Sequence, residues 1–132
     1  MITYKEIKNF KEKDLKDLFL SVGWISANYS DRLVKAIANS DTVFSAWSNG
    51  KLIGLINVLD DGELTAYVHY LLIKPTFQNN GIGKELIRRV KSKYKDYLYV
   101  ILTAENNKVV PFYEKQGFHI VYRALPMTIY NP

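Results

Sequence analysis

Apolar side chains change their spacing several times along the chain, and each change predicts a new element. Residues 2–7 alternate between apolar and polar positions, which is typical of an edge strand. Residues 11–22, and the stretch opened by Ser30-Asp31, instead repeat apolar positions at helical spacing. We therefore expect a short strand followed by two amphipathic helices. Their apolar faces carry Leu15, Leu18, Phe19 and Val22, then Leu33, Val34, Ile37 and Ala38.

The middle of the chain predicts strands separated by turns. Ser48-Asn49-Gly50 is a strong hairpin signal between two apolar runs, residues 42–47 and 51–59. A second turn, residues 60–63, precedes a long strand over 64–73. Pro75 ends the pairing of that strand, because proline has no N–H to donate. The later patterns predict a helix over 81–95, a strand over 97–102, a short helix over 108–116 stopped by Gly117, and final strands over 118–123 and 127–130.

This order of elements predicts the fold class. The first strands form an antiparallel meander, and a strand–helix–strand crossover then follows. We predict an α/β (α+β) fold with a mixed, mostly antiparallel central sheet, flanked by helices in three layers. The 132 residues contain no linker and no internal repeat, so a single domain, 1–132, is expected.

The loop Gln78-Asn79-Asn80-Gly81-Ile82-Gly83-Lys84 joins an apolar strand to a helix. The first N–H groups of a helix lack intrahelical partners and lie at the positive end of its dipole, so a phosphate can bind there. Glycine at positions 81 and 83 lets a ligand approach these N–H groups closely. The spacing fits neither a P-loop nor the three-glycine dinucleotide motif. A plain strand-to-helix turn is the alternative interpretation.

Composition limits the chemistry and the location. The chain has no cysteine, which excludes disulfides, a thiolate nucleophile and cysteine-ligated zinc. It lacks the apolar core of a signal peptide and any run long enough to span a membrane, so we expect a cytoplasmic protein without a membrane partner. A net charge of +5 indicates an anionic partner or simply a surplus of lysine. Much of this charge follows the glycine-bearing loop, at Lys84, Arg88, Arg89, Lys91, Lys93 and Lys95.

Several stretches together resemble the GCN5-related N-acetyltransferase (GNAT) superfamily. They are residues 72–75, the loop at 78–83, residues 106–113 and Gly117-Phe118. Within this superfamily the chain resembles most closely a subgroup of small bacterial acetyltransferases related to plant serotonin N-acetyltransferase. Further shared stretches are Val22-Gly23-Trp24, Ala38-Asn39-Ser40, Leu52-Ile53-Gly54, Asp61 and residues 127–132.

The resemblance implies acetyl-CoA as co-substrate and a place for each of its parts. The backbone of Leu71, Leu72 and Ile73 would pair with the pantetheine amides like an added strand. The side-chain amide of Asn106 would contact the cofactor, with helix capping as the alternative. Tyr113 stands where the family has its tyrosine general acid, and packing beside Phe112 is the alternative. The pyrophosphate would bind to the backbone of Gln78, Asn79, Asn80, Gly81, Ile82, Gly83 and Lys84.

Acetyl transfer to an amine also needs a general base and a donor to the developing oxyanion. The backbone N–H of Leu72 or Ile73 is the expected oxyanion donor. Asp61 matches an acidic position of the subgroup, although aspartate is common in turns. Tyr70 departs from the subgroup, which commonly has an aspartate there. The other candidates for the base are Glu63, His69 and Glu105.

We therefore predict an acetyl-CoA-dependent N-acetyltransferase that acts on a primary amine of a small molecule or a protein, without an acyl-cysteine intermediate. Aromatic and acidic residues around Trp24, Tyr70 and Asp61 favour a cationic amine. The resemblance also suggests a homodimer, built through the strand at 127–130. A non-catalytic acetyl-CoA-binding protein is the first alternative. A basic nucleic-acid-binding module is the second, but no recognition motif supports a nucleic-acid partner.

Overall fold

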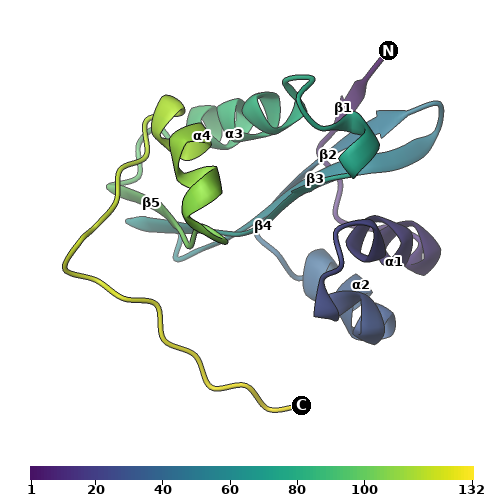
Figure 1. The fold of residues 1–132 in the computed structure, drawn as a ribbon, viewed down its shortest axis with the longest axis horizontal. Coiled ribbons are helices and arrows are strands. Elements are labelled where there is room, and N and C mark those ends of the chain that lie inside the picture. The colour runs from purple at the N-terminus through teal and green to yellow at the C-terminus, as the bar shows by residue number, and fades with distance from the viewer. The chain divides into compact units, whose positions relative to one another are not determined.

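The computed structural model describes all residues from 1 to 132, which form two compact parts, residues 1–102 and 103–132. The first part is built on a five-stranded sheet whose spatial order follows the chain (Figure 1). β1 to β4 pair antiparallel in sequence, and β5 lies parallel to β4. The strands are β1 (Thr3–Lys5), β2 (Thr42–Ser48), β3 (Lys51–Asp60), β4 (Thr65–Ile73) and β5 (Tyr99–Leu102). The predicted edge strand, meander and crossover are confirmed.

Turn chemistry sets the register of the central hairpin. Asn49 and Gly50, between β2 and β3, have φ values of 51° and 75°. Two consecutive left-handed residues match the twist of the flanking strands, which is why an Asn-Gly pair favours this connection. The backbone N–H of Lys74 donates to the Ile53 carbonyl at 2.8 Å, and Pro75 then ends the pairing as predicted.

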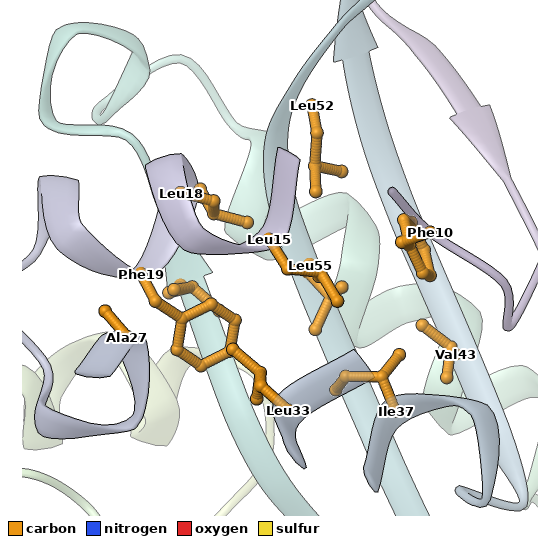
Figure 2. Close-up of a cluster of buried hydrophobic side chains, with 11 residues drawn as sticks. Phe10, Leu15, Leu18, Phe19, Ala27, Leu33, Ile37, Val43, Leu52 and Leu55 are labelled. Carbon is orange, nitrogen blue, oxygen red and sulfur yellow. The ribbon is translucent and has the colours of Figure 1, made fainter. Parts of the chain in front are cut away.

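Helices cover both faces of the sheet in the first part. α1 (Glu12–Ser21), a 3₁₀ helix (Ile25–Tyr29) and α2 (Ser30–Ala38) lie on one face, and α3 (Ile82–Lys93) lies on the other (Figure 1). Most of the side chains predicted for the faces of α1 and α2 are buried among strand residues, as Figure 2 shows for Leu15, Leu18, Phe19, Leu33 and Ile37. Val22, Val34 and Ala38 are only partly buried. This cluster contains Phe10, Leu15, Leu18, Phe19, Ala27, Leu33, Ile37, Val43, Leu52, Leu55 and Leu72. Its burial is the main force that holds α1 and α2 on the sheet.

Gly54 lets α3 approach the opposite face. A Cβ at this position would lie 2.9 Å from Cδ1 of Ile73 and 3.4 Å from Cγ2 of Ile82. Ile82 is the first residue of α3 and is only 2% exposed. The missing side chain of Gly54 therefore brings the start of α3 close to the end of β4.

The second part holds a 3₁₀ helix (Asn107–Val109) and α4 (Val110–Lys115), after which Gly117 adopts a φ of 99°. The predicted short helix is confirmed, and the glycine stops it because a left-handed residue is costly for other side chains. The two strands predicted at 118–123 and 127–130 are wrong, since residues 118–132 form neither helix nor strand. An alternating pattern supplies side chains for a strand but not the neighbouring edge that a strand must pair with.

Candidate active site

The loop at 78–84 adopts an open conformation before α3. Asn79 and Gly81 have left-handed φ values of 67° and 78°, and a Cβ at Gly81 would meet nothing within 4 Å. Gly81 is the N-cap of α3, and no side chain caps the helix. The first intrahelical bond runs from Glu85 N–H to the Gly81 carbonyl, at 3.0 Å. The N–H groups of Ile82, Gly83 and Lys84 therefore precede the helical ladder and have no intrahelical partner.

The side chain of Gln78 holds the loop to the sheet, and that of Asn80 holds it to the turn before it. Gln78 Nε2 donates to the Ile73 carbonyl at 3.1 Å, at the last residue of β4. Asn80 Nδ2 donates to the Phe77 carbonyl at 3.2 Å. These bonds use side chains to fix the backbone. The main-chain N–H of Gln78 is also used, because it donates to the Pro75 carbonyl at 3.3 Å.

The charge near the start of α3 is balanced within the helix. Glu85 accepts bonds from Arg88 Nη2 at 2.7 Å and from Arg89 Nε at 2.8 Å. These bonds, those of Arg88 above all, lower the pKa of Glu85 from 4.5 to about 2. A carboxylate in the first turn would repel a bound anion, and the two guanidinium groups offset that repulsion. Lys84 remains exposed beside the loop.

β4 and β5 separate halfway along β4. The parallel pairing runs from Thr65 opposite Tyr99 to Val68 opposite Leu102, and there it ends. β4 continues to Ile73, still paired with β3 on its other edge. The edge of β4 from His69 to Ile73 that faces away from β3 therefore has no strand beside it. The sequence alone could not reveal this separation.

The register determines which backbone groups face this open edge. The Lys74 N–H donates to the Ile53 carbonyl, so these two residues form a hydrogen-bonded pair. Such pairs recur at every second residue of an antiparallel ladder, so Leu72 and Leu55 form the next one. Successive residues in a strand present their N–H groups to opposite edges, so Leu71 and Ile73 face the open edge. Leu72 was included in the predicted cofactor strand, but its backbone instead lies in the ladder with β3.

Aromatic rings line the α1/α2 face of β4 next to the separation. The ring of Tyr70 lies 5.0 Å from Phe19 and 5.8 Å from Trp24, measured between centroids. His69 stacks on Tyr70 with 4.0 Å between ring centroids and 22° between planes. Loss of hydration in these surroundings lowers the pKa of the His69 imidazole below 6.5. A neutral imidazole at pH 7 is able to accept a proton.

Asp61 and Glu63 lie in the turn between β3 and β4, at the other end of β4. Asp61 Oδ1 accepts from the N–H groups of Glu63, Leu64 and Thr65, at 2.9, 2.8 and 3.1 Å. These bonds lower the pKa of this exposed carboxyl, which makes it a weaker base. Six residues of strand separate Thr65 from Leu71, roughly 20 Å at the usual rise. The geometry therefore gives Asp61 a turn-stabilising role and argues against it as the base.

The remaining predicted residues lie in the second part. Asn106 Oδ1 accepts from the Lys108 N–H at 2.9 Å and so caps the 3₁₀ helix that begins at Asn107. Tyr113 packs between Phe112 and Phe118, at 5.2 and 5.9 Å between ring centroids. Burial, and then the charge of Glu105, raise the pKa of the Tyr113 phenol above 10. This phenol therefore keeps its proton at neutral pH.

Asn57 is the residue near the site that sequence reasoning missed. It is 1% exposed, in the middle of β3, and its Oδ1 accepts from the Tyr70 N–H at 2.8 Å. The signal was present in the sequence, since Asn57 is the only amide side chain in the apolar run over 51–59. A buried polar group in such a run requires partners, but the sequence does not identify them.

This mixed five-stranded sheet, flanked by helices and split between two parallel strands, has the architecture of a class of acyl-group transferases. The model of the acetyltransferase (GNAT) family matches residues 7–118. The chain belongs to the GNAT family and is an N-acetyltransferase.

Relatives and solved structures agree with this assignment. An uncharacterized ycf52-like N-acetyltransferase from Prochlorococcus marinus is 31% identical over 121 residues, which cover 87% of this chain and 66% of that protein. The ycf52 N-acetyltransferase of Pyropia yezoensis is 30% identical over 89% of this chain and 72% of its own length. This chain thus spans about two thirds of the length of these relatives.

Among solved structures, a GNAT family acetyltransferase from Streptococcus pneumoniae has a TM-score of 0.85 and 31% identity. The match covers 99% of this chain and 98% of that one. An acetyltransferase structure from Deinococcus radiodurans has a TM-score of 0.82 and 28% identity, over 98% and 87% of the two chains. The predicted mixed α/β GNAT fold is confirmed.

No helix in the structure combines the length and apolarity needed to cross a membrane.

Proposed function

We propose that this N-acetyltransferase transfers the acetyl group of acetyl-CoA directly to a primary amine of a small molecule or a protein. The observation that carries the proposal is the alignment of two features in one stretch of chain. The open edge of β4 from His69 to Ile73 is followed, after a short 3₁₀ helix (Pro75–Phe77) and the glycine-bearing loop, by the uncapped N-terminus of α3 at Gly81. The edge suits amide groups and the helix N-terminus suits phosphate, which are the two kinds of polar group along this donor.

The residues present fit the donor. The N–H groups of Ile82, Gly83 and Lys84 would hold the pyrophosphate, in space that no side chain fills at Gly81. The backbone groups of Leu71 and Ile73 would pair with the pantetheine arm. Lys84 adds a positive charge beside the loop. In the second part, the Nδ2 group of Asn106 would contact the donor while Oδ1 caps its helix.

Acetyl-CoA would supply an activated acetyl group, and this chain would supply the polar and acid–base groups. The N–H of Leu71, at the open edge, would donate to the oxygen that gains negative charge during attack. His69, neutral at pH 7, would take the proton of the attacking amine directly or through water. Tyr113 would give its phenolic proton to the departing sulfur. The chain has no cysteine and so cannot form an acyl-cysteine intermediate, which supports direct transfer.

The acceptor remains a class rather than a compound. The rings of Phe19, Trp24 and Tyr70 beside the open edge support an amine with an aromatic or cationic part. A peptidyl-lysine N-acetyltransferase of Escherichia coli is 32% identical over 55% of this chain and 47% of its own length, which keeps protein amines among the candidates. We retain the plant serotonin N-acetyltransferase subgroup as a proposal that rests on the shared sequence stretches.

We also propose a homodimer built through the C-terminal segment. Exposed apolar side chains concentrate there, including Ile120, Val121, Leu125, Met127 and Ile129, which are 42–95% exposed. Such a segment can gain a strand partner from a second copy of the chain. Light scattering of the full chain and of a chain ending at residue 118 tests this. The same number of copies per particle in both would contradict it. The expected location of the enzyme is cytoplasmic.

Thiol release from acetyl-CoA across a panel of amines tests the proposed function. The panel includes arylalkylamines, polyamines, amino acids and lysine peptides, and the absence of cysteine removes any background from the enzyme. Acetyl-CoA-dependent release with one class of amine supports the proposal and identifies the acceptor class. A thermal shift with acetyl-CoA but no release with any amine would favour a binding protein instead. Salt-dependent RNA binding without a thermal shift would favour the nucleic-acid alternative.

A further inference from the structure

We propose that Asn57 is a positioning residue that holds the separation of β4 from β5 and thereby aims the Leu71 N–H at the open edge. The inference rests on the function proposed above, because it concerns the same strand. The apolar pattern of β3 marks Asn57 as an unusual polar residue, but neither that pattern nor the GNAT motifs give it a role.

The separation coincides with a bulge in β4. Asn57 lies opposite Tyr70 in the ladder, and the next residue, Val58, lies opposite Val68. His69 is therefore an extra residue with no partner in β3, which is the definition of a β-bulge. The last pair between β4 and β5 is Val68 with Leu102, one residue before the bulge. The bulge thus stands at the point where the sheet opens.

The Asn57 side chain spans this bulge. Its Oδ1 accepts from the Tyr70 N–H at 2.8 Å, and its Nδ2 donates to Ser40 Oγ at 3.0 Å. Ser40 Oγ in turn donates to the Ala36 carbonyl at 3.0 Å. Because Ser40 has used its only proton, it can only accept from Asn57, and this fixes which end of the amide faces Tyr70.

Burial makes these bonds hard to replace. Asn57 and Ser40 are each 1% exposed, so water cannot take over the bond between them, and the bond to the Tyr70 N–H is partly buried. A backbone N–H that loses its partner in such a place is costly, so the bulge would rearrange to regain one. Asn57 therefore connects the C-terminal end of α2 to one amide of β4.

The stacking of His69 on Tyr70 is a consequence of the bulge. Neighbouring side chains in a regular strand point to opposite faces, yet these two rings stack with 4.0 Å between centroids. If His69 were instead paired with a residue of β3, the register of β4 would shift by one residue on one side of it. The N–H groups there would then face the opposite edge, and the side chains the opposite face. The Leu71 N–H, the His69 imidazole and the Tyr70 ring would then lose their present directions together.

The test compares Asn57→Leu with Ser40→Ala in the full chain. Asn57→Leu removes the acceptor for the Tyr70 N–H, whereas Ser40→Ala removes a neighbouring bond of the same network and leaves that acceptor in place. We expect kcat for acetyl transfer to fall about 10- to 100-fold in Asn57→Leu, as for a reacting group displaced by an ångström, with KM for acetyl-CoA changed much less. Ser40→Ala keeps most of the wild-type kcat. A folded Asn57→Leu enzyme with wild-type kcat would overturn the proposal.

Amide NMR gives a second readout that does not depend on turnover. The Tyr70 amide should be protected from hydrogen exchange in wild type and in Ser40→Ala, and lose protection in Asn57→Leu. If Asn57→Leu does not fold, Asn57→Asp replaces it, because its carboxylate still accepts from the Tyr70 N–H. This variant should keep both the wild-type kcat and the protection of the Tyr70 amide. A folded Asn57→Asp enzyme that loses either of them would overturn the proposal. If wild type releases no thiol with any amine, the proposed function fails. Amide hydrogen exchange alone then tests the role of Asn57 in the bulge. A Tyr70 amide that is unprotected in wild type would refute that role.

Discussion

The hydroxyl groups of Ser26 and Tyr70 lie 2.7 Å apart, across 44 residues of sequence. Ser26 belongs to the 3₁₀ helix between α1 and α2, and Tyr70 belongs to β4 beside the split in the sheet. This bond ties the loop that flanks the proposed acceptor side to the strand that carries the proposed oxyanion donor. It also gives a polar partner to a tyrosine that otherwise packs against Phe19 and Trp24.

Tyr70→Phe should remove this bond and keep the packing of the ring. We expect a loss of about 1 kcal/mol in the free energy of unfolding, the usual net value of such a bond. Ser26→Ala should cost a similar amount, and the double variant should cost less than the sum of the two, because both changes remove the same interaction. Urea unfolding of the four proteins measures this, and strictly additive losses would show that the bond contributes nothing.

Gly81→Glu should abolish acetyl-CoA binding, because it places bulk and negative charge where the pyrophosphate is proposed to lie. The left-handed φ of 78° also strains any side chain there, by about 1–2 kcal/mol. Gly50→Glu is the matched control, since Gly50 has a φ of 75° and equally open space, but lies in the β2–β3 turn. Calorimetric titration with acetyl-CoA should detect binding to wild type and Gly50→Glu only. Tight binding by Gly81→Glu would place the donor elsewhere.

The sequence predicted the parts of this molecule that depend on neighbouring residues. The pair Asn49-Gly50 specified a turn, Pro75 ended β4, and Gly81 began α3, because each acts through its own backbone. The bulge at His69 was not predicted, since it depends on a hydrogen bond that the Tyr70 N–H donates to the side chain of Asn57, 13 residues earlier in the chain. The strands expected after Phe118 failed for the same reason, because pairing requires a distant edge.

The same reasoning applies to the site. Asp61 was a candidate for the base on the strength of a motif, but three turn N–H groups use the same carboxylate oxygen. Leu72 was a candidate for cofactor binding, but the register directs its backbone to β3. The loop at 78–84 could be predicted because the strand, the glycines and the helix lie within a few residues of one another in the sequence. Hydrogen-bond partners and register are properties of the folded chain.

Tyr113→Phe should lower kcat by about 100-fold or more if the phenol protonates the departing sulfur. The change should leave the binding of acetyl-CoA nearly intact, because the ring and its contacts with Phe112 and Phe118 remain. Tyr122→Phe is the control, because Tyr122 lies in the same part of the chain and is 86% exposed. This change should leave kcat at the wild-type value. Because burial raises the Tyr113 pKa above 10, wild-type kcat should not fall from loss of this proton below pH 10. Unchanged turnover in Tyr113→Phe would eliminate it as the acid.

Glu85→Gln should destabilise the start of α3 in a pH-dependent way. The folded-state pKa of Glu85 is lowered from 4.5 to about 2, so its stabilisation is fully present above pH 4.5 and is lost as the pH falls towards 2. The carboxylate is partly exposed, which limits the contribution to about 0.5–1 kcal/mol. Thermal unfolding should therefore separate the variant from wild type at pH 7 and not at pH 2. A difference that persists at pH 2 would point to packing instead of charge.

His69→Gln should test the proposed base through the pH dependence of turnover. Loss of hydration lowers the folded-state pKa of His69 below 6.5, so the imidazole is mostly neutral at pH 7 and gains its proton only under more acidic conditions. Wild-type kcat should therefore fall on the acid side, with a midpoint below 6.5. In His69→Gln this acid limb should disappear, and kcat at pH 7.5 should drop by about 100-fold.

The chain offers its own control, because it contains only one other histidine, the exposed His119. His119→Gln should keep the acid limb and the wild-type kcat. The amine itself also titrates, so the profile should be measured with two acceptors of different pKa. A limb that moves with the acceptor belongs to the amine, whereas a limb that stays fixed belongs to the enzyme. A fixed limb that survives in His69→Gln would assign the base to another residue, and Glu105 would be the next to replace.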